Sequence, residues 1–306
     1  IRHLFAPVLH DYTSPLILDD GKIYRIDDDP IWTKPFGKRL CIVDVDTRSM
    51  NKTNEPWNTA GAFNWHNIET SAGVLNHYLY SKIHGYDYKF IHTTPYPDRD
   101  TPWSRIPALS SLLKEYDLVV SVDIDVIFPQ LHIPYEWLLN IWGVTADTAI
   151  ALPTEPFMKG WNGSKDRKGR RNDNAGFMTL QKVPRVQEML KKWVDCPVKR
   201  KACAHFKHRW PAEQGAFNEF IRYEYWDIIR EIPCDDALGY PGMNSNCHGR
   251  LVSHYTLAKK HVKEAAQTAL AYGVMQQLQL DLQSRTSELK IERLKFGLDA
   301  EPEPTS

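Results

Sequence analysis

The first half of the chain alternates short apolar runs with segments of helical spacing. Apolar, β-branched runs at 39–46, 88–92 and 118–122 predict strands, and the segments between them, at 65–84 and 105–116, have the three- and four-residue spacing of helices. A run as apolar as 118–122 is typical of a strand buried on both faces of a sheet. The β-α-β-α-β order therefore predicts an α/β fold with a single, mainly parallel sheet flanked by helices, and ligands at the carboxyl ends of the strands.

The second half extends this alternation and ends in a helical segment. We expect helices at 185–194 and 213–223. Further strands are expected at 148–152 and 176–180, and closing strands at 228–232 and 251–255. A Pro-free segment at 257–296, rich in Ala, Leu, Gln and Lys, predicts a long helix. This helix packs either on the body or on a second subunit, in which case it forms a homodimer.

These elements divide the chain into four parts. Residues 1–38 mix aromatics, acids and prolines without periodicity and predict an irregular N-terminal wrap. The alternating elements define a main domain at 39–260, and the helical segment defines a C-terminal helical extension at 261–300. The end, 301–306, alternates Glu and Pro and predicts a disordered tail.

Composition places the chain among ordinary globular proteins. Hydrophobic residues make up 42% and charged residues 25% of its 306 residues, which excludes collagen-like and disordered classes. The 38 Lys and Arg residues balance the 38 Asp and Glu residues, so we expect no nucleic acid among its partners. No apolar run approaches the roughly 18 residues of a membrane span. Since the sequence begins with Ile1 rather than Met, we expect it to reach a membrane only through a missing N-terminal anchor.

The cysteines indicate disulfides. Cys196 and Cys203 close one short loop, Cys234 and Cys247 close another, and Cys41 lies in an apolar run. This layout predicts two local disulfides and one buried thiol. Zinc is the alternative, but neither pair has the close spacing of a zinc knuckle.

Two sequons support the same compartment as the paired cysteines. Asn51 and Asn162 each begin an Asn-x-Ser/Thr sequence in a polar, turn-rich segment that could carry a glycan. Glycans and disulfides are both typical of the oxidising secretory pathway. The sequence therefore predicts a protein of the secretory lumen.

Two acids follow the most apolar strand directly. Asp123 and Asp125 are two residues apart, so on an extended chain their carboxylates point the same way. Two anions beside an apolar strand are costly unless a cation neutralises them, and hard oxygen ligands favour Mg²⁺ or Mn²⁺. The alternative is a pair of solvated acids at the end of a strand, because Asp-x-Asp is common by chance.

Motifs spread over residues 39–260 resemble those of one enzyme family. They comprise Trp-Ser-Arg-Ile-Pro at 103–107, the Asp-x-Asp segment, Asn-Ala-Gly at 174–176, Glu-Gln-Gly-Ala at 213–216, and His254 with Lys259. In order and spacing they resemble glycosyltransferase family 34, the fungal galactosyl- and mannosyltransferases and plant xylosyltransferases. The chain departs from the family pattern at Arg105, where lysine is usual, and at Ala175, where threonine is usual.

The resemblance implies an activity and a location. It implies a GT-A fold and a metal-dependent, retaining transfer of a hexose, galactose or mannose, from a UDP-sugar or GDP-sugar to an oligosaccharide or glycoprotein. By matching position, Asp123, Asp125 and His254 hold Mn²⁺ or Mg²⁺, with Asp123 shared between the metal and the ribose. Lys259 matches the family's diphosphate-binding lysine. The family also implies a Golgi location, as the lumenal part of a type II membrane protein.

The nucleotide side of the site is expected from three further residues. Arg105 matches a position that holds the base or a phosphate. Thr47 and Arg48 follow the first strand, where a parallel sheet presents the base. Ordinary structural roles explain these residues as well, solvation of a helix start for Arg105 and a turn for the other two.

The catalytic side is expected near Asn174 and Gln214. Gln214 matches the family's donor-facing residue, although capping of a helix N-terminus would also explain it. Retention normally calls for a nucleophile opposite the leaving group, and Asp173 is the acid near Asn174 that could act covalently. Without a better nucleophile, we expect front-face attack through an ion pair, with the leaving phosphate assisting deprotonation of the acceptor.

Two other functions compete with sugar transfer. The segments 44–47 and 123–126 each mimic the Asp-x-Asp nucleophile motif of haloacid-dehalogenase-type phosphatases, but the later paired-acid motif of that fold has no match here. A non-catalytic carbohydrate-binding relative is the second alternative. Both a glycosyltransferase and a carbohydrate-binding protein would need surfaces on which a sugar can stack. Candidates for this role are Trp103, Trp161 and Trp210, whereas most aromatic residues should form the core.

Overall fold

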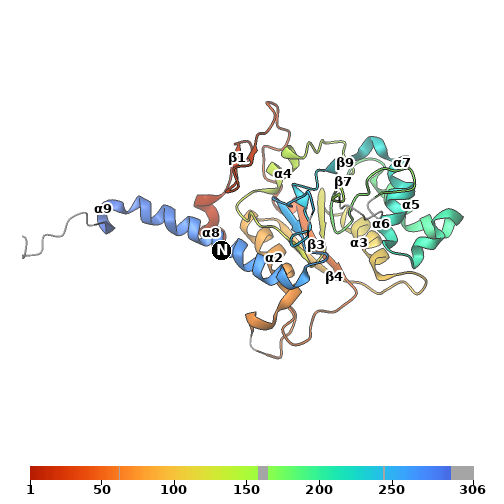
Figure 1. Ribbon diagram of the computed structural model, residues 1–306, viewed down its shortest axis with the longest axis horizontal. Coiled ribbons are helices and arrows are strands. Elements are labelled where there is room, and N and C mark those ends of the chain that lie inside the picture. Colours follow the sequence, from red (N-terminus) through yellow and green to blue (C-terminus); the bar gives the residue numbers. More distant parts are fainter. Residues whose placement is uncertain (62, 158–164, 244, 291–306) are drawn as a thin grey trace, which may run out of the picture.

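The computed structural model describes residues 1–61, 63–157, 165–243 and 245–290, and a sheet runs through the centre of its body (Figure 1). In this described part the sheet has six strands in the order β4-β3-β5-β8-β7-β9. Their bounds are β3 Leu40–Asp46, β4 Asp87–His92, β5 Leu118–Val122, β7 Ile150–Pro153, β8 Phe177–Gln181 and β9 Ile229–Ile232.

Most neighbouring strands of this sheet run parallel. β3 pairs in parallel with β4 and β5, and β7 with β9, whereas β8 runs antiparallel to β5 and β7. The residues described between β7 and β8 hold no crossover helix, which a parallel pair would need. The structure therefore confirms the predicted α/β fold with a mainly parallel central sheet, and it adds one reversed strand.

Helices cover both faces of the central sheet. Successive side chains of a strand point to opposite faces, so Val120 of β5 enters one core and its neighbour Val119 enters the other. The two faces are covered by different helices. Those on the Val120 side are α2 Ala72–His84 and α4 Tyr135–Ile141, and those on the Val119 side are α3 Arg105–Leu112, α5 Val186–Lys199 and α6 Ala212–Ala216.

Several element boundaries differ from the sequence prediction. The helix expected at 65–84 begins with two 3₁₀ turns and becomes α-helical only at Ala72. The helix expected at 213–223 is interrupted by a π-helical turn, Phe217–Ile221, between α6 and α7 (Arg222–Glu224). Helix α4 was not expected from the apolar pattern, because its Tyr-Glu-Trp-Leu-Leu-Asn-Ile sequence is too short to display a period.

A second, small sheet carries the expected closing strand at 251–255. This strand is β11 (Val252–His254), and it lies between β10 (Ala237–Leu238) and β6 (Val126–Ile127) instead of in the central sheet. β6 follows the Asp-x-Asp segment directly. The antiparallel register pairs His254 with Val126, so β11 brings a residue from far along the chain next to the two aspartates.

The N-terminal residues and the C-terminal helix pack on each other. α1 (Arg2–Phe5) lies against the middle of α8 (Val262–Ser284), where a Cβ on Gly273 would approach Phe5 to 2.3 Å. A hairpin of β1 (Leu16–Ile17) and β2 (Ile23–Tyr24) follows α1.

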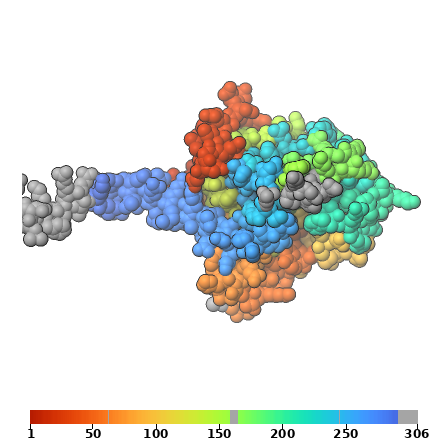
Figure 2. All heavy atoms as spheres, viewed as in Figure 1, coloured from red at the N-terminus to blue at the C-terminus, as the bar shows by residue number. Residues whose placement is uncertain are grey.

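The C-terminal half of α8 and the short α9 (Thr286–Leu289) extend away from the body (Figures 1 and 2). Met275, Leu278 and Leu282 on this extension are exposed. A homodimer through this helix stays a prediction. Among the described helices, none is both long and apolar enough to cross a membrane.

Both predicted disulfides are present. Cys196 bonds to Cys203 and Cys234 bonds to Cys247, with Cα atoms 5.8 Å and 5.6 Å apart. Cys41 is a buried thiol, as expected. The sequon at Asn162 and the candidate platform Trp161 lie outside the described residues.

Candidate functional site

A pocket of about 670 Å³ opens beyond the carboxyl ends of β3 and β5. The residues that follow these two strands line it, as a mainly parallel sheet predicts. The structure brings together most of the site residues expected from the sequence. Those that line the pocket are Thr47, Arg48, Arg105, Asp123, Asp125, Asn174, Gln214, His254 and Lys259.

Three side chains in the pocket form a candidate metal centre. Nε2 of His254 lies 3.2 Å from Oδ1 of Asp125 and 3.9 Å from Oδ2 of Asp123. One donor atom from each of the three residues lies within 4.8 Å of the others. Asp125 and His254 are buried, and Nδ1 of His254 has no hydrogen-bond partner among the described residues. Two carboxylates and an imidazole that converge in this way fit a divalent ion such as Mn²⁺.

Charges within this cluster compensate one another. Burial opposes the charge of Asp125, but hydrogen bonds from His254 and Lys259 hold the pKa of its carboxyl well below the usual range. Burial likewise disfavours a charged His254, and the neighbouring aspartates nevertheless raise its pKa. Nζ of Lys259 lies 3.1 Å from Oδ2 of Asp125. A bound cation would take over this neutralising role and displace the proton from His254.

Gly176 leaves the space that His254 occupies. A Cβ at this position would lie 2.2 Å from Cε1 of His254 and 2.9 Å from Oδ2 of Asp123. The carbonyl of Gly176 also accepts a hydrogen bond of 2.8 Å from the amide of Asp123. The glycine of the Asn-Ala-Gly motif is thus required by close packing against two of the three candidate ligands.

Arg105 supports Asp123 instead of pointing freely into the pocket. Its guanidinium donates to Oδ1 of Asp123 at 2.7 Å and to the carbonyl of Ala175 at 2.6 Å. Burial raises the pKa of Asp123, and the Arg105 charge opposes this rise. Arg105 also lies 3.5 Å from Glu213, whose pKa burial raises to about 7. The observed role of Arg105 is to orient a candidate ligand, and its expected contact with the nucleotide stays a prediction.

Glu155, which was not predicted as a site residue, links the remaining polar residues of the pocket. Its carboxylate accepts hydrogen bonds from Nδ2 of Asn174 at 2.8 Å, from Nε2 of Gln214 at 3.1 Å and from the Tyr240 hydroxyl at 2.5 Å. Gln214 in turn accepts a bond of 2.9 Å from the amide of Ala175. Glu155 follows β7, so its place after a strand was the available signal, but no motif accompanies it.

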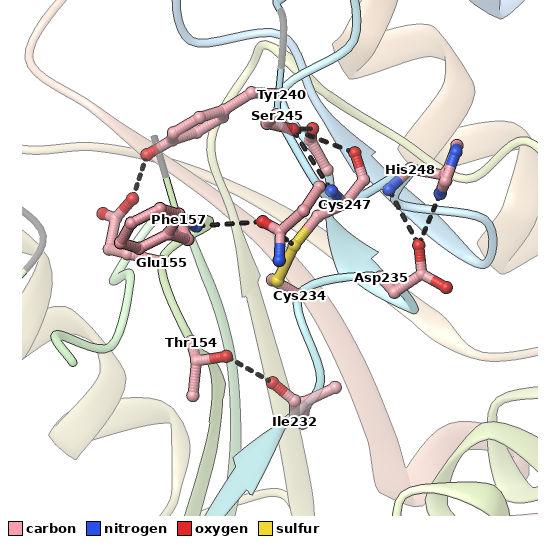
Figure 3. The surroundings of a disulfide bond; sticks show 12 residues. Thr154, Glu155, Phe157, Ile232, Cys234, Asp235, Tyr240, Ser245, Cys247 and His248 are labelled. Carbon is pink, nitrogen blue, oxygen red and sulfur yellow. Dashed lines mark hydrogen bonds and ion pairs between the residues drawn. A yellow bond between two sulfur atoms is a disulfide. The ribbon is translucent and has the colours of Figure 1, made fainter. Parts of the chain in front are cut away.

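The disulfide between Cys234 and Cys247 stabilises this side of the pocket (Figure 3). It joins the end of β9 to the loop after β10, and Tyr240 reaches from the same region to Glu155. A hydrogen bond from the amide of Phe157 to Asn246 ties the two segments together again. The disulfide therefore crosslinks the segment whose Tyr240 holds Glu155 in the pocket.

Asp173 is the expected site residue that the structure places elsewhere. Its side chain is fully buried beside Arg222, with Oδ2 3.2 Å from the guanidinium, and it does not line the pocket. Burial raises its pKa to about 7. Its neighbour Asn174 does face the pocket. The covalent role considered for Asp173 therefore does not fit the structure, because Asp173 has no access to a ligand there.

Helix α2 holds the Asp-x-Asp segment in place by close packing and hydrogen bonds. A Cβ on Gly73 would lie 1.9 Å from the carbonyl oxygen of Ile124, so helix and turn are in backbone contact. Three residues on, Asn76 donates to the carbonyl of Phe128 at 3.2 Å and accepts from its amide at 2.8 Å. These positions lie on one face of the helix.

His77, on the same helix, adds a hydrogen bond to this segment and a buried ion pair with Asp44. Nε2 lies 2.8 Å from the carbonyl oxygen of Val126, and Nδ1 lies 3.0 Å from both carboxylate oxygens of Asp44. Both ring nitrogens face acceptors, so the imidazole is in its charged, doubly protonated form. Burial opposes this charge, but Asp44 raises the pKa of His77. Tyr88 donates a further hydrogen bond of 2.8 Å to Asp44.

Comparisons with known proteins found similarity of structure. No family model matches the sequence, and no curated protein matches it. A glycosyltransferase involved in the glycosylation of the major capsid of PBCV-1 is 14% identical with a TM-score of 0.49, over 74% of this chain and 99% of that one. GlyE of Streptococcus pneumoniae TIGR4 is 13% identical with a TM-score of 0.41, over 85% and 67%. The galactosyltransferase LgtC, in complex with donor and acceptor sugar analogs, is 15% identical with a TM-score of 0.39, over 75% and 95%.

Replacing the glycine beneath the candidate metal centre tests its geometry. In Gly176→Ala the added methyl group displaces His254, so we expect the Kd for Mn²⁺, measured by calorimetry, to rise by about 10- to 100-fold. Gly61→Ala is the matched control, because its Cβ would meet only Asn58, at 3.9 Å. Unchanged Mn²⁺ affinity in Gly176→Ala would contradict the proposed ligand set.

A second variant tests the contacts of His77, through which α2 holds the Asp-x-Asp segment. His77→Leu leaves Asp44 charged and buried without its partner, so we expect the free energy of unfolding, measured with denaturant, to fall by about 3–5 kcal/mol. The double variant His77→Leu/Asp44→Asn removes both charges and should lose less. If His77→Leu were as stable as the wild type, the buried ion pair would have no structural role.

Proposed function

We propose that this protein is a metal-dependent, retaining glycosyltransferase, which moves a hexose from a nucleotide diphosphate sugar to a glycan hydroxyl. The observation that carries the proposal is the convergence of Asp123, Asp125, His254 and Lys259 at one end of the sheet. Acidic ligands for a cation, with a lysine beside them, suit a diphosphate better than a neutral ligand.

In this proposal Asp123, Asp125 and His254 hold Mn²⁺ or Mg²⁺. When bound, the ion supplies Lewis-acid stabilisation for the negative charge that develops on the leaving diphosphate. Lys259 adds a second positive charge for the same group. Its side chain is 59% exposed, so its ammonium can turn from Asp125 towards an entering phosphate.

Thr47 and Arg48 form the nucleotide end of the proposed site, after β3. Arg48 is held by Asp46, which accepts bonds from its backbone amide at 2.8 Å and from its guanidinium at 3.0 Å and 2.6 Å. The backbone and side chain of Arg48 are thereby fixed beside the pocket. The site is suited to UDP or GDP, and the donor sugar is galactose or mannose by the resemblance to family 34.

Gln214 and Asn174 form the sugar end, and their arrangement supports front-face attack. The Glu155 carboxylate is occupied by three hydrogen bonds, and Asp173 lies outside the pocket. We therefore propose that the bond between the anomeric carbon and the diphosphate oxygen breaks first. The acceptor oxygen then bonds to the same face, and its proton passes to the departing phosphate. Gln214 orients the donor, since Glu155 and the Ala175 amide hold its side chain in place.

The phosphatase alternative fits the structure less well. Its nucleophile would be the first acid of an Asp-x-Asp motif, and Asp44 is fully buried in its pair with His77. Asp123, the first acid of the other motif, is held by Arg105. The other alternative is a non-catalytic carbohydrate-binding protein, and an assay of donor hydrolysis distinguishes it from an enzyme.

We also propose that the protein works in the secretory lumen, in the Golgi. The two disulfides support this location, because such bonds persist in oxidising compartments. Asn51 lies in an exposed loop and is accessible for a glycan.

Donor hydrolysis with added Mn²⁺ tests the proposal. We expect the wild type to release UDP or GDP from a UDP-hexose or GDP-hexose, and EDTA to abolish this release. Asp125→Asn should lower the rate by at least about 100-fold, because it removes a ligand of the cation. Asp117→Asn is the matched control, since Asp117 pairs with Arg39 on the surface.

Two results would contradict the proposal. Cleavage of a phosphate monoester such as p-nitrophenyl phosphate, without release of a nucleoside diphosphate, would favour the phosphatase. Binding of glycans with neither reaction would favour the carbohydrate-binding relative.

A further inference from the structure

An exposed tryptophan borders the pocket. The side chain of Trp210 is 75% exposed, and in the described part of the chain no other large apolar side chain is more exposed. Trp210 and the adjacent Pro211 both line the pocket. Trp103, another candidate platform, is fully buried and belongs to the core. Trp210 is therefore the described candidate that a ligand can reach.

The surroundings of Trp210 differ from those of the structural tryptophans. The indole N–H of Trp103 donates to the carbonyl of Phe206, and that of Trp193 donates to the carbonyl of Glu213. The indole N–H of Trp210 has no partner among the described residues. Tryptophan is on average a strongly buried residue, so an indole that is open both at its face and at its N–H, beside a pocket, suits recognition of a ligand.

A second exposed apolar side chain borders the same pocket from another segment. Leu257 is 60% exposed and lies between His254 and Lys259 in the chain. Trp210 lies just before α6, the short helix that carries Gln214. The two apolar side chains thus belong to the segments that carry the proposed metal ligand, the diphosphate lysine and the donor-facing glutamine.

We propose that Trp210, together with Leu257, forms the acceptor subsite and stacks on the apolar face of a neutral pyranose ring. This inference rests on the proposed function. A pyranose presents C–H groups on its faces and hydroxyls around its edge, which matches the electron-rich face and polar N–H of an indole. A few polar groups beside aromatic side chains are also the usual composition of a small-ligand pocket.

The competing ligand for the indole is the nucleobase of the donor. The pocket places Thr47 and Arg48 after β3, where the base is expected, whereas Trp210 adjoins the helix that carries Gln214. This arrangement favours the acceptor. A tryptophan that stacks on the base would affect the affinity for the free nucleotide, so the two roles can be measured separately.

The test compares Trp210→Ala and Trp210→Phe with the wild type. The acceptor probes are methyl α-D-mannopyranoside, methyl β-D-galactopyranoside and α-1,2-mannobiose, with the donor that the wild type hydrolyses. We expect Trp210→Ala to raise the KM for the best acceptor by at least about 10-fold with little change in kcat, and Trp210→Phe to recover most of that loss. The Kd for UDP or GDP should change less than about twofold in both variants.

The matched control is Trp226→Ala. Trp226 is 44% exposed and stacks with Arg170 outside the pocket, so this variant should keep the KM of the wild type. Since Trp210 is exposed, its variants should melt at the temperature of the wild type, which the thermal denaturation of each variant checks.

Three results would overturn the acceptor subsite. The first is an unchanged acceptor KM in Trp210→Ala, and the second is a rise of more than about twofold in its Kd for UDP or GDP. The third is a wild type that hydrolyses the donor but transfers to none of the three glycans. Absence of donor hydrolysis in the wild type would instead overturn the proposed function itself.

Discussion

The structure depends on keeping two carboxylates together at the end of a fully buried strand. β5 is buried at every position, and Asp123 and Asp125 follow it within three residues. Their mutual repulsion in a low-dielectric setting has to be offset by cations. Arg105 supplies one charge to Asp123, and His254 and Lys259 supply charge to Asp125. The arrangement is compact enough that one divalent ion can serve both acids.

Parts of the fold that are remote in sequence converge on this constraint. Helix α2 holds the backbone after Asp125 through His77, and β11 brings His254 next to Asp125 through its pairing with β6. The disulfide after β9 supports the wall on which Glu155 organises the sugar end. Helices on both faces of the central sheet contribute, α2 from the Val120 side and α3, which carries Arg105, from the Val119 side. Such a rigid frame suits a reaction in which positioning and electrostatic stabilisation provide most of the catalysis.

Much of this arrangement could be predicted from the sequence. The features that were missed could not be predicted for physical reasons. Apolar strands and the Asp-x-Asp pair are visible because periodicity and charge are local properties. His254 could be found only by resemblance, since its partners lie about 130 residues away and no local pattern marks it. Glu155 was missed because its role arises from contacts with three other segments. The polar pair Asn76 and His77 interrupts the apolar start of α2, and it was the available signal that this helix holds the Asp-x-Asp segment.

The central claim is that one divalent ion, held by Asp123, Asp125 and His254, anchors the donor diphosphate. Diffraction from crystals grown with Mn²⁺ and UDP or GDP, recorded at the manganese absorption edge, tests it most directly. The account predicts one strong anomalous peak within coordinating distance of all three side chains and of the diphosphate oxygens. A bound nucleotide with no peak between these residues, or a peak elsewhere in the pocket, would contradict it.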